Sequence, residues 1–210
     1  MVYPIVRFTL IPLLNLFIKE VKGVENIPKK GAFIMAANHE SYLDPLMINT
    51  IMISRVNRRI HFLASTKTKL FWNMFGGEYF LRHWAGVIPL RKEDKGKSAL
   101  KEATELLKKG EIAGIFPRPR QYPGENIKPK TGVARLILSS RKPLLPVAVK
   151  GTFKLMPNRP SIPKFKRNVT VIIGKPITFD KYYKEKVTKN LLRKMTTEII
   201  NKIDHLHKNG

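Results

Sequence analysis

A histidine and an aspartate stand five residues apart in the segment AANHESYLDP, residues 36–45. A neutral imidazole can take a proton at one ring nitrogen while a carboxylate holds the N–H of the other, which fixes the tautomer and stabilises the imidazolium that forms. His39 could therefore act as a general base, with Asp44 as the residue that orients it. Because a straight strand would hold the two side chains apart, this pairing requires a turn between them.

Both residues also have a structural interpretation. The residue before a proline avoids the helical region, and proline favours the first helical position, so Asp44 is well placed to cap a helix that opens at Pro45. A single histidine beside an apolar strand is more often a hydrogen-bonded structural residue than a base. For Asp44 the two roles are compatible, because a carboxylate has two oxygens.

Short apolar runs and helical patterns alternate along the middle of the chain. Strands are predicted at residues 32–37, 60–64, 86–90, 111–117, 143–151 and 168–174, and helices at 45–54, 69–76, 94–109, 131–140 and 187–205. This alternation predicts a single-domain αβ sandwich with a largely parallel central sheet. Ligands of such sheets gather beyond the carboxyl ends of the strands, which is where His39, Arg91 and the segment FPRPR are expected.

The composition is strongly basic and contains no cysteine. Lys and Arg number 40 against 15 Asp and Glu, a net charge of +25, which predicts a polyanionic partner: nucleic acid, an anionic membrane surface or a phosphorylated substrate. The absence of cysteine excludes disulfides, thiolate zinc sites and a cysteine nucleophile. No metal site is expected from His205 and His207, which stand near the C-terminus without a third ligand.

The first eighteen residues are apolar, but their longest uncharged run, residues 8–18, has only eleven residues. A bilayer-spanning helix needs roughly 20, and no signal-peptide pattern is present. We therefore expect residues 1–20 to form an interfacial membrane-associating segment and residues 21–210 to form the folded domain. The alternative is a buried N-terminal helix packed on that domain.

The pattern Asn38-His39-x-Ser41-x-x-Asp44-Pro45 resembles the NHxxxxD signature of the glycerolipid acyltransferases, the family of 1-acyl-glycerol-3-phosphate acyltransferases. The similarity extends over roughly residues 21–178 in the expected order. It includes the segments VKGVENIP, GAFIMAANHESYLDP, FLASTKTKLF, GVIPLRK, KTGVARLILSS, PLLPVAV and VIIGKPI.

This resemblance implies transfer of an acyl group from acyl-CoA or acyl carrier protein to a free hydroxyl of lysophosphatidic acid or a related lysophospholipid. The resemblance also implies that His39 is the general base, that Asp44 orients it, and that no cofactor is needed beyond the acyl donor. The alkoxide attacks the thioester directly, which agrees with the absence of cysteine and of a G-x-S-x-G motif. The expected location is the cytoplasmic face of a membrane, as a peripheral or monotopic protein.

Several residues match family positions that bind the acceptor or its phosphate: Ser41, Lys67, Arg91 and Lys130. Arginine forks and lysine ammonium groups both suit phosphate oxygens. For any single lysine in so basic a chain, a solvated surface charge is the alternative. The positions of these residues within motifs favour the binding role.

The segment FPRPRQYPG, residues 116–124, departs from the family pattern Phe-Pro-Glu-Gly-Thr-Arg. Arg118 replaces a glutamate, and Pro119 replaces a glycine, which exchanges a flexible N–H-bearing backbone for a fixed one. One hypothesis is that Arg118 and Arg120 clasp a more anionic headgroup or an additional phosphate. Another is a weakened or inactive membrane-binding homologue. A nucleic-acid-binding protein is less favoured, because no RNA- or DNA-binding signature is present.

Overall fold

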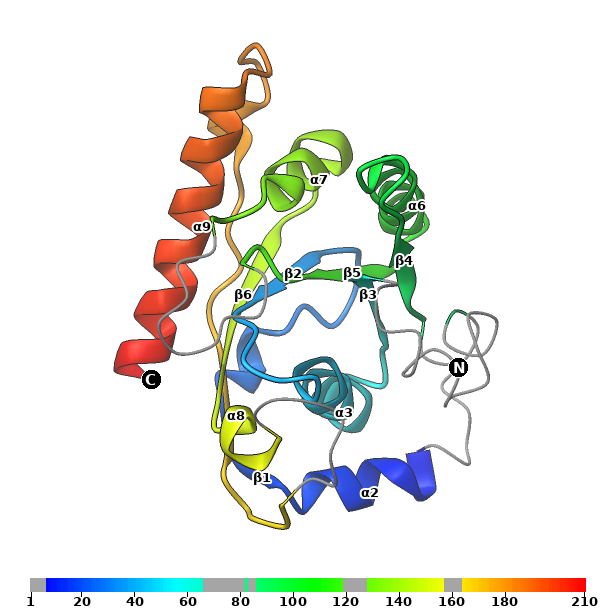
Figure 1. Cartoon of the computed structure of the whole chain (residues 1–210), viewed down its shortest axis with the longest axis vertical. Coiled ribbons are helices and arrows are strands. Elements are labelled where there is room, and N and C mark those ends of the chain that lie inside the picture. Colours follow the sequence, from blue (N-terminus) through cyan, green and yellow to red (C-terminus); the bar gives the residue numbers. More distant parts are fainter. Residues whose placement is uncertain (1–6, 66–81, 83–85, 119–127, 157–163) are drawn as a thin grey trace.

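The computed structural model describes residues 7–65, 82, 86–118, 128–156 and 164–210. Within them, seven strands form one sheet in the order β1-β7-β6-β2-β5-β3-β4 (Figure 1). The strands are β1 (Ile18–Lys22), β2 (Ile34–Ala37), β3 (Ile60–Ser65), β4 (Ile88–Leu90), β5 (Ile112–Ile115), β6 (Leu144–Lys150) and β7 (Val169–Ile173).

The five strands from β6 to β4 in this order run parallel to one another. β7 is antiparallel to β6, and β1 is parallel to β7, so these two strands run against the rest. The expected largely parallel sheet is therefore confirmed. β2 and β5 are buried along their whole length, as their continuous apolar sequences require when helices cover both faces of a sheet.

Helices lie on both faces of the sheet (Figure 1). α6 (Lys97–Lys108), α7 (Gly132–Ser140) and α9 (Lys189–Asn209) cover one face, and α3 (Asp44–Val56) and the short α2 (Leu10–Asn15) lie on the other. The smaller elements are α8 (Thr152–Leu155) and single 3-10 turns, Val24–Asn26 and Asp180–Tyr182. The predicted helix at residues 69–76 lies outside the described residues.

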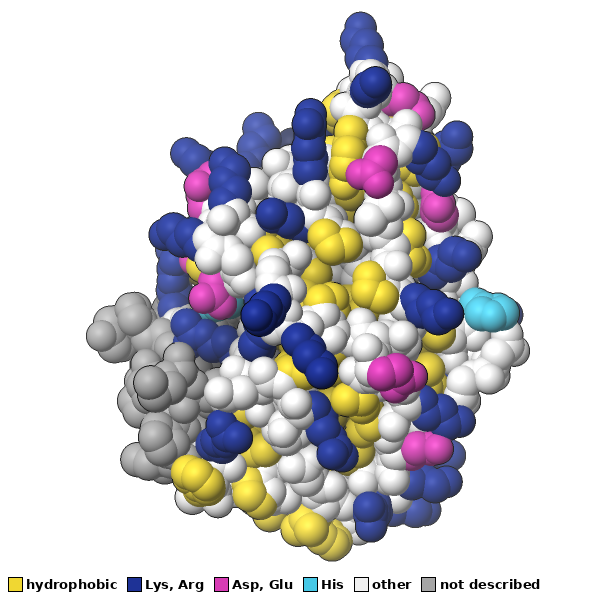
Figure 2. Space-filling view, turned by 180° about the vertical axis from the view of Figure 1, so that it is seen from behind, with side chains coloured by type: hydrophobic (Ala, Val, Ile, Leu, Met, Phe, Trp, Pro, Cys, Tyr) yellow, Lys and Arg dark blue, Asp and Glu magenta, His cyan; other side chains and the backbone are white. Residues whose placement is uncertain are grey.

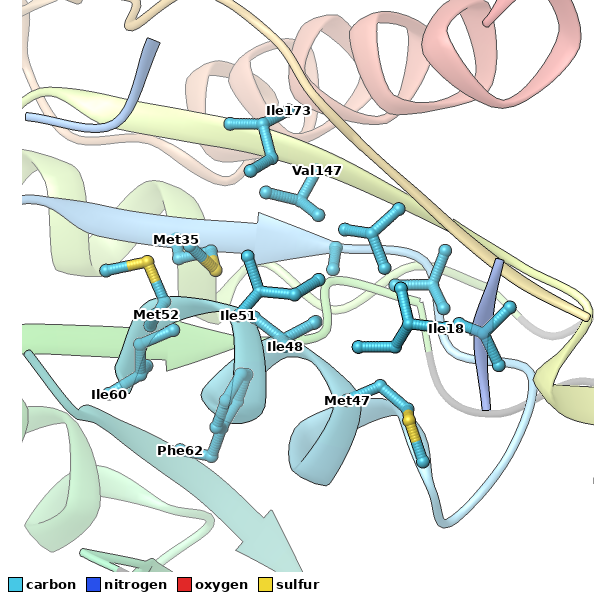
Figure 3. Packing of buried hydrophobic residues seen from close by; sticks show 14 of the residues in the cluster. Ile18, Met35, Met47, Ile48, Ile51, Met52, Ile60, Phe62, Val147 and Ile173 are labelled. Carbon is cyan, nitrogen blue, oxygen red and sulfur yellow. The ribbon is translucent and has the colours of Figure 1, made fainter. Parts of the chain in front are cut away.

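Each face of the sheet has its own hydrophobic core. Figure 3 shows α3 against the strands, with Ile51 and Met52 facing side chains such as Met35 and Ile60. α3 buries residues on most of its faces, and each fully buried aliphatic side chain stabilises the fold by roughly 1.5–3 kcal/mol. This packing fixes the position of the first turn of α3, where Asp44 lies.

The described N-terminal residues include a helix that packs on the domain, the alternative to a separate interfacial segment. In α2, Ile11 and Leu14 are buried and the helix packs on α3, whereas Leu10, Leu13 and Leu16 are exposed on its other side. β1 begins at Ile18 and pairs with β7, so residues 18–20 belong to the sheet rather than to a separate segment ending at residue 20. Among the described helices, none is long and apolar enough to cross a bilayer.

Candidate active site

Asn38 extends the pairing of β2 with β6 beyond the end of the strand. Its side-chain oxygen accepts a hydrogen bond from the backbone N–H of Val149 at 2.7 Å, and its Nδ2 donates to the carbonyl of Val149 at 2.8 Å. The amide side chain thus takes the place of the next backbone pair in the ladder. It holds the chain at the point where it leaves the sheet, immediately before His39.

The side chains of His39 and Asp44 meet across the turn that follows. Nδ1 of His39 lies 2.7 Å from Oδ2 of Asp44. Because a carboxylate only accepts, Nδ1 is the nitrogen that carries the proton, and Nε2 carries the lone pair in the neutral ring. The side chain of His39 is 19% exposed and that of Asp44 is fully buried, so a buried anion orients a base that remains accessible.

Three further donors surround the Asp44 carboxylate. Oδ2 accepts the backbone N–H groups of Glu40 at 2.7 Å and Ser41 at 2.8 Å, and Oδ1 accepts the hydroxyl of Thr152 at 2.5 Å. α3 begins at Asp44 itself, with Leu43 at the capping position, so Asp44 binds the preceding turn instead of capping the helix as predicted. The helix N-terminus and these donors offset the cost of burying the charge.

An aromatic stack supports the imidazole from one side. The rings of His39 and Phe116 are nearly parallel, with centroids 4.2 Å apart, and Phe116 in turn stacks on Phe62 at 5.2 Å. Phe116 follows the carboxyl end of β5, as His39 follows that of β2. The adjacent parallel strands β2 and β5 therefore position the imidazole ring together. The turn after β2 holds Asp44 against Nδ1, and Phe116 after β5 packs on the flat face of the ring.

Ser41 does not lie where an acceptor could reach it. Its side chain is fully buried, and its hydroxyl donates to the carbonyl of Met156 at 3.0 Å while accepting the N–H of Leu43 at 3.3 Å. The predicted contact between Ser41 and substrate disagrees with this geometry, because both hydrogen-bonding directions already have partners. In the structure, Ser41 stabilises the turn between His39 and Asp44.

A pocket of about 890 Å³ opens beyond the carboxyl ends of β3, β4 and β5. Phe116 forms part of its wall, so the pocket reaches the aromatic ring on which His39 packs. Arg91 and Lys130 both line it, as the sequence predicted for residues that share one site. Further cations come from the loop before α6 (Lys92, Lys95), from α7 (Arg135) and from α9 (Lys189, Arg193).

Arg118 occupies a different place from the one predicted. Its guanidinium forms two contacts with the carboxylate of Asp204 on α9, at 3.3 and 2.9 Å. It does not line the pocket, so the predicted clasp on an anionic headgroup disagrees with the structure. Lys67 and Arg120, which were also expected to bind the acceptor, lie outside the described residues.

A second contact joins the end of α9 to the motif. Nε2 of His207 lies 2.8 Å from Oε1 of Glu40, the residue after His39. The helix that the sequence predicted to end at residue 205 continues to Asn209, and its last turn packs beside the site. Sequence reasoning also missed Thr152, whose single available signal was its position just after the carboxyl end of β6.

The family model described as Acyltransferase matches residues 19–150, which include the histidine–aspartate motif, Arg91 and Lys130. The chain belongs to the acyltransferase family. This acyltransferase is 31% identical over 161 residues to the 1-acyl-sn-glycerol-3-phosphate acyltransferase of Bacillus subtilis, covering 75% of this chain and 73% of that one. It is also 31% identical over 165 residues to a chloroplast enzyme of the same name from Arabidopsis thaliana, covering 75% of this chain and 43% of that one.

The fold of this acyltransferase also resembles that of a solved relative. The crystal structure of the 1-acyl-sn-glycerophosphate acyltransferase PlsC from Thermotoga maritima superposes with a TM-score of 0.62 at 25% identity, covering 97% of this chain and 82% of that one. The relatives named here are acyltransferases that carry the name of the predicted family, and the predicted family and enzyme class are confirmed.

Proposed function

We propose that this acyltransferase moves an acyl group from a thioester, acyl-CoA or acyl carrier protein, to the free hydroxyl of lysophosphatidic acid or a related lysophospholipid. The observation that carries the proposal is the contact between Nδ1 of His39 and the buried carboxylate of Asp44 beside a cationic pocket. A base held in one tautomer supplies the proton transfer, and the cations suit a phosphate on the acceptor.

In the proposed reaction, Nε2 of His39 removes the proton from the acceptor hydroxyl as its oxygen attacks the thioester carbonyl carbon. A carbon–oxygen bond forms, and the resulting oxyanion collapses with cleavage of the carbon–sulfur bond. The thiolate leaves and takes up the proton from the imidazolium, so the ester, the thiol and the neutral base are regenerated. Asp44 stabilises the imidazolium through Nδ1 without taking its proton.

Arg91 and Lys130 are the proposed ligands of the acceptor phosphate. Both line the pocket whose wall is formed by Phe116, so a phosphate bound there places the rest of the acceptor near the ring of His39. Arginine binds phosphate oxygens with two parallel donors, and lysine adds a point charge. Lys67 and Arg120 remain proposed contributors from the family pattern.

The proposed location is the cytoplasmic face of a membrane, held by peripheral contact. Four large apolar side chains near the N-terminus are exposed: Phe8 (75%), Leu13 (53%), Leu16 (51%) and Leu10 (41%). Figure 2 shows hydrophobic side chains along the lower edge of the molecule, where α2 lies, and many Lys and Arg side chains on the face above. Such a surface suits insertion into the headgroup layer of an anionic bilayer.

The proposal is tested by incubating the protein with liposomes, acyl-CoA and lysophosphatidic acid, and measuring both free CoA and phosphatidic acid. We expect the two products to appear in equal amounts. Vesicle binding without product from any lysophospholipid, with acyl-CoA and with acyl carrier protein, would instead indicate an inactive membrane-binding homologue. Salt-sensitive binding to DNA with none to vesicles would indicate the nucleic-acid-binding alternative.

A further inference from the structure

The pocket contains more positive charge than one acceptor phosphate requires. A phosphate monoester carries at most about two negative charges at pH 7. Cations from three separate parts of the chain line the pocket, and no Asp or Glu is among the lining residues that the structure describes. Arg91 and Lys130, the proposed ligands of the acceptor phosphate, already supply two charges, so the other cations of the pocket can bind a second anionic group.

Three of the remaining cations lie on α7 and α9. Lys189 and Arg193 stand in the first two turns of α9, and Arg135 stands in α7, which packs against α9. The other end of α9 is fixed beside the motif, because Asp204 contacts Arg118. Arg193 precedes Asp204 by three turns of helix, about 16 Å along the axis. The cations at the start of α9 therefore lie about three helical turns from the contact that holds α9 beside the residues flanking the base.

We propose that Arg135, Lys189 and Arg193 form a second phosphoryl-binding subsite, which holds the phosphorylated nucleotide of an acyl-CoA donor. The inference rests on the proposed function and identifies the donor of that reaction. Coenzyme A carries a diphosphate and a 3′-phosphate on its adenosine, and a long pantetheine arm separates these anions from the thioester. This spacing suits a cluster of cations remote from His39, with the arm extending toward Phe116 along the apolar wall that includes Leu100 and Leu192.

A concave pocket also favours a small donor over a carrier protein. Its volume of about 890 Å³ is in the range of sites that enclose a cofactor-sized molecule, and apolar side chains form much of its wall. An acidic carrier protein would instead dock on an outer surface and insert its phosphopantetheine arm, which carries a single phosphodiester. The three cations at α7 and α9 match the diphosphate and 3′-phosphate of coenzyme A better than that single negative charge.

The first test measures binding of adenosine 3′,5′-bisphosphate to the full-length protein by calorimetry, without any acyl transfer. We expect the wild-type protein to bind it, and the double variant Lys189→Gln/Arg193→Gln to bind about tenfold more weakly, as removal of charge-assisted contacts to phosphate predicts. The charge-matched control Lys175→Gln/Lys202→Gln changes two exposed residues outside the pocket and should bind as the wild type does. Equal binding by all three proteins, or no binding by the wild type, would overturn the proposal.

The second test separates the donor from the acceptor by steady-state kinetics. In the Lys189→Gln/Arg193→Gln variant, KM for acyl-CoA should rise about tenfold, while KM for lysophosphatidic acid and the rate with S-acyl-pantetheine, which lacks the nucleotide, should not change. A rise confined to the KM of lysophosphatidic acid would assign the cations to the acceptor and contradict the proposal. Loss of transfer with every donor, with nucleotide binding intact, would refute the proposed function but not the subsite.

Discussion

At the residue scale, the central feature is a buried carboxylate that accepts four hydrogen bonds. Asp44 accepts from His39, from two backbone N–H groups and from Thr152, and it is buried. The backbone donors come from the turn between the two motif residues, which explains why a separation of five residues works. The spacing predicted the His39–Asp44 pair correctly, but it could not predict Thr152, which stands 108 residues further along the chain.

Thr152→Val should reduce the rate of acyl transfer by about tenfold, because it removes a hydrogen bond to a buried charged group worth about 1.5–3 kcal/mol and leaves the shape almost unchanged. The separate variant Thr152→Ser, which keeps the hydroxyl, should retain most of the wild-type rate. The measurement is kcat with lysophosphatidic acid for both variants, together with their thermal midpoints. Equal rates in Thr152→Val and the wild type would show that this donor does not contribute to orienting Asp44.

At the element scale, α9 connects the C-terminus to the residues that flank the base. Arg118, two residues after Phe116, pairs with Asp204, and Glu40, one residue after His39, pairs with His207. The helical pattern predicted α9 but ended it at residue 205, because the last residues, HLHKNG, carry little apolar periodicity. Likewise, β1 was not predicted, since IKEVK is an edge strand with charged, largely exposed side chains.

The departure at Arg118 is explained by its partner in α9 rather than by a headgroup. A charge reversal, Arg118→Asp or Asp204→Arg alone, should lower the free energy of unfolding by about 1 kcal/mol and reduce activity, because each places like charges in contact. The double variant Arg118→Asp/Asp204→Arg should recover part of both losses. A double-mutant cycle on the thermal midpoint and on kcat/KM measures the coupling.

Two outcomes would contradict this explanation of Arg118. Additive losses in the double variant would show that the two side chains do not interact in solution. A large gain in activity on lysophosphatidic acid from Arg118→Glu alone would show that the arginine limits acceptor choice, as the sequence had suggested.

At the scale of the whole molecule, the two features on which the proposed membrane contact depends are the net charge of +25 and the exposed apolar side of α2. The fold class and the sheet were predictable from alternating apolar runs, because each buried parallel strand reads as a short continuous hydrophobic segment. The net charge alone did not distinguish a nucleic acid, a membrane surface and a phosphorylated substrate as the partner. In the structure, some of the cationic side chains line a pocket and others lie on the outer surface, and the sequence pattern did not predict this division.

Binding to anionic vesicles should therefore have an electrostatic and an apolar part. We expect wild-type binding to weaken from 0.1 to 0.5 M salt, as the Debye length falls from about 10 Å to roughly half of that. Leu13→Asp/Leu16→Asp should weaken it further at every salt concentration, because these exposed side chains are the proposed membrane contacts. The control Val187→Asp changes an equally exposed apolar residue away from α2 and should have little effect in the same sedimentation assay. Equal losses in the two variants would refute a specific role for α2.

The most direct measurement of the proposed mechanism is kcat/KM for acyl transfer to lysophosphatidic acid in His39→Ala and His39→Gln, compared with the wild type. Removal of a general base should lower the rate by about 10²–10⁴-fold in both variants. Their circular dichroism spectra and vesicle binding should stay unchanged, because the ring contributes mainly its contacts with Asp44 and Phe116 to the fold. A folded His39→Ala protein that retained the wild-type rate would contradict the assignment of His39 as the base.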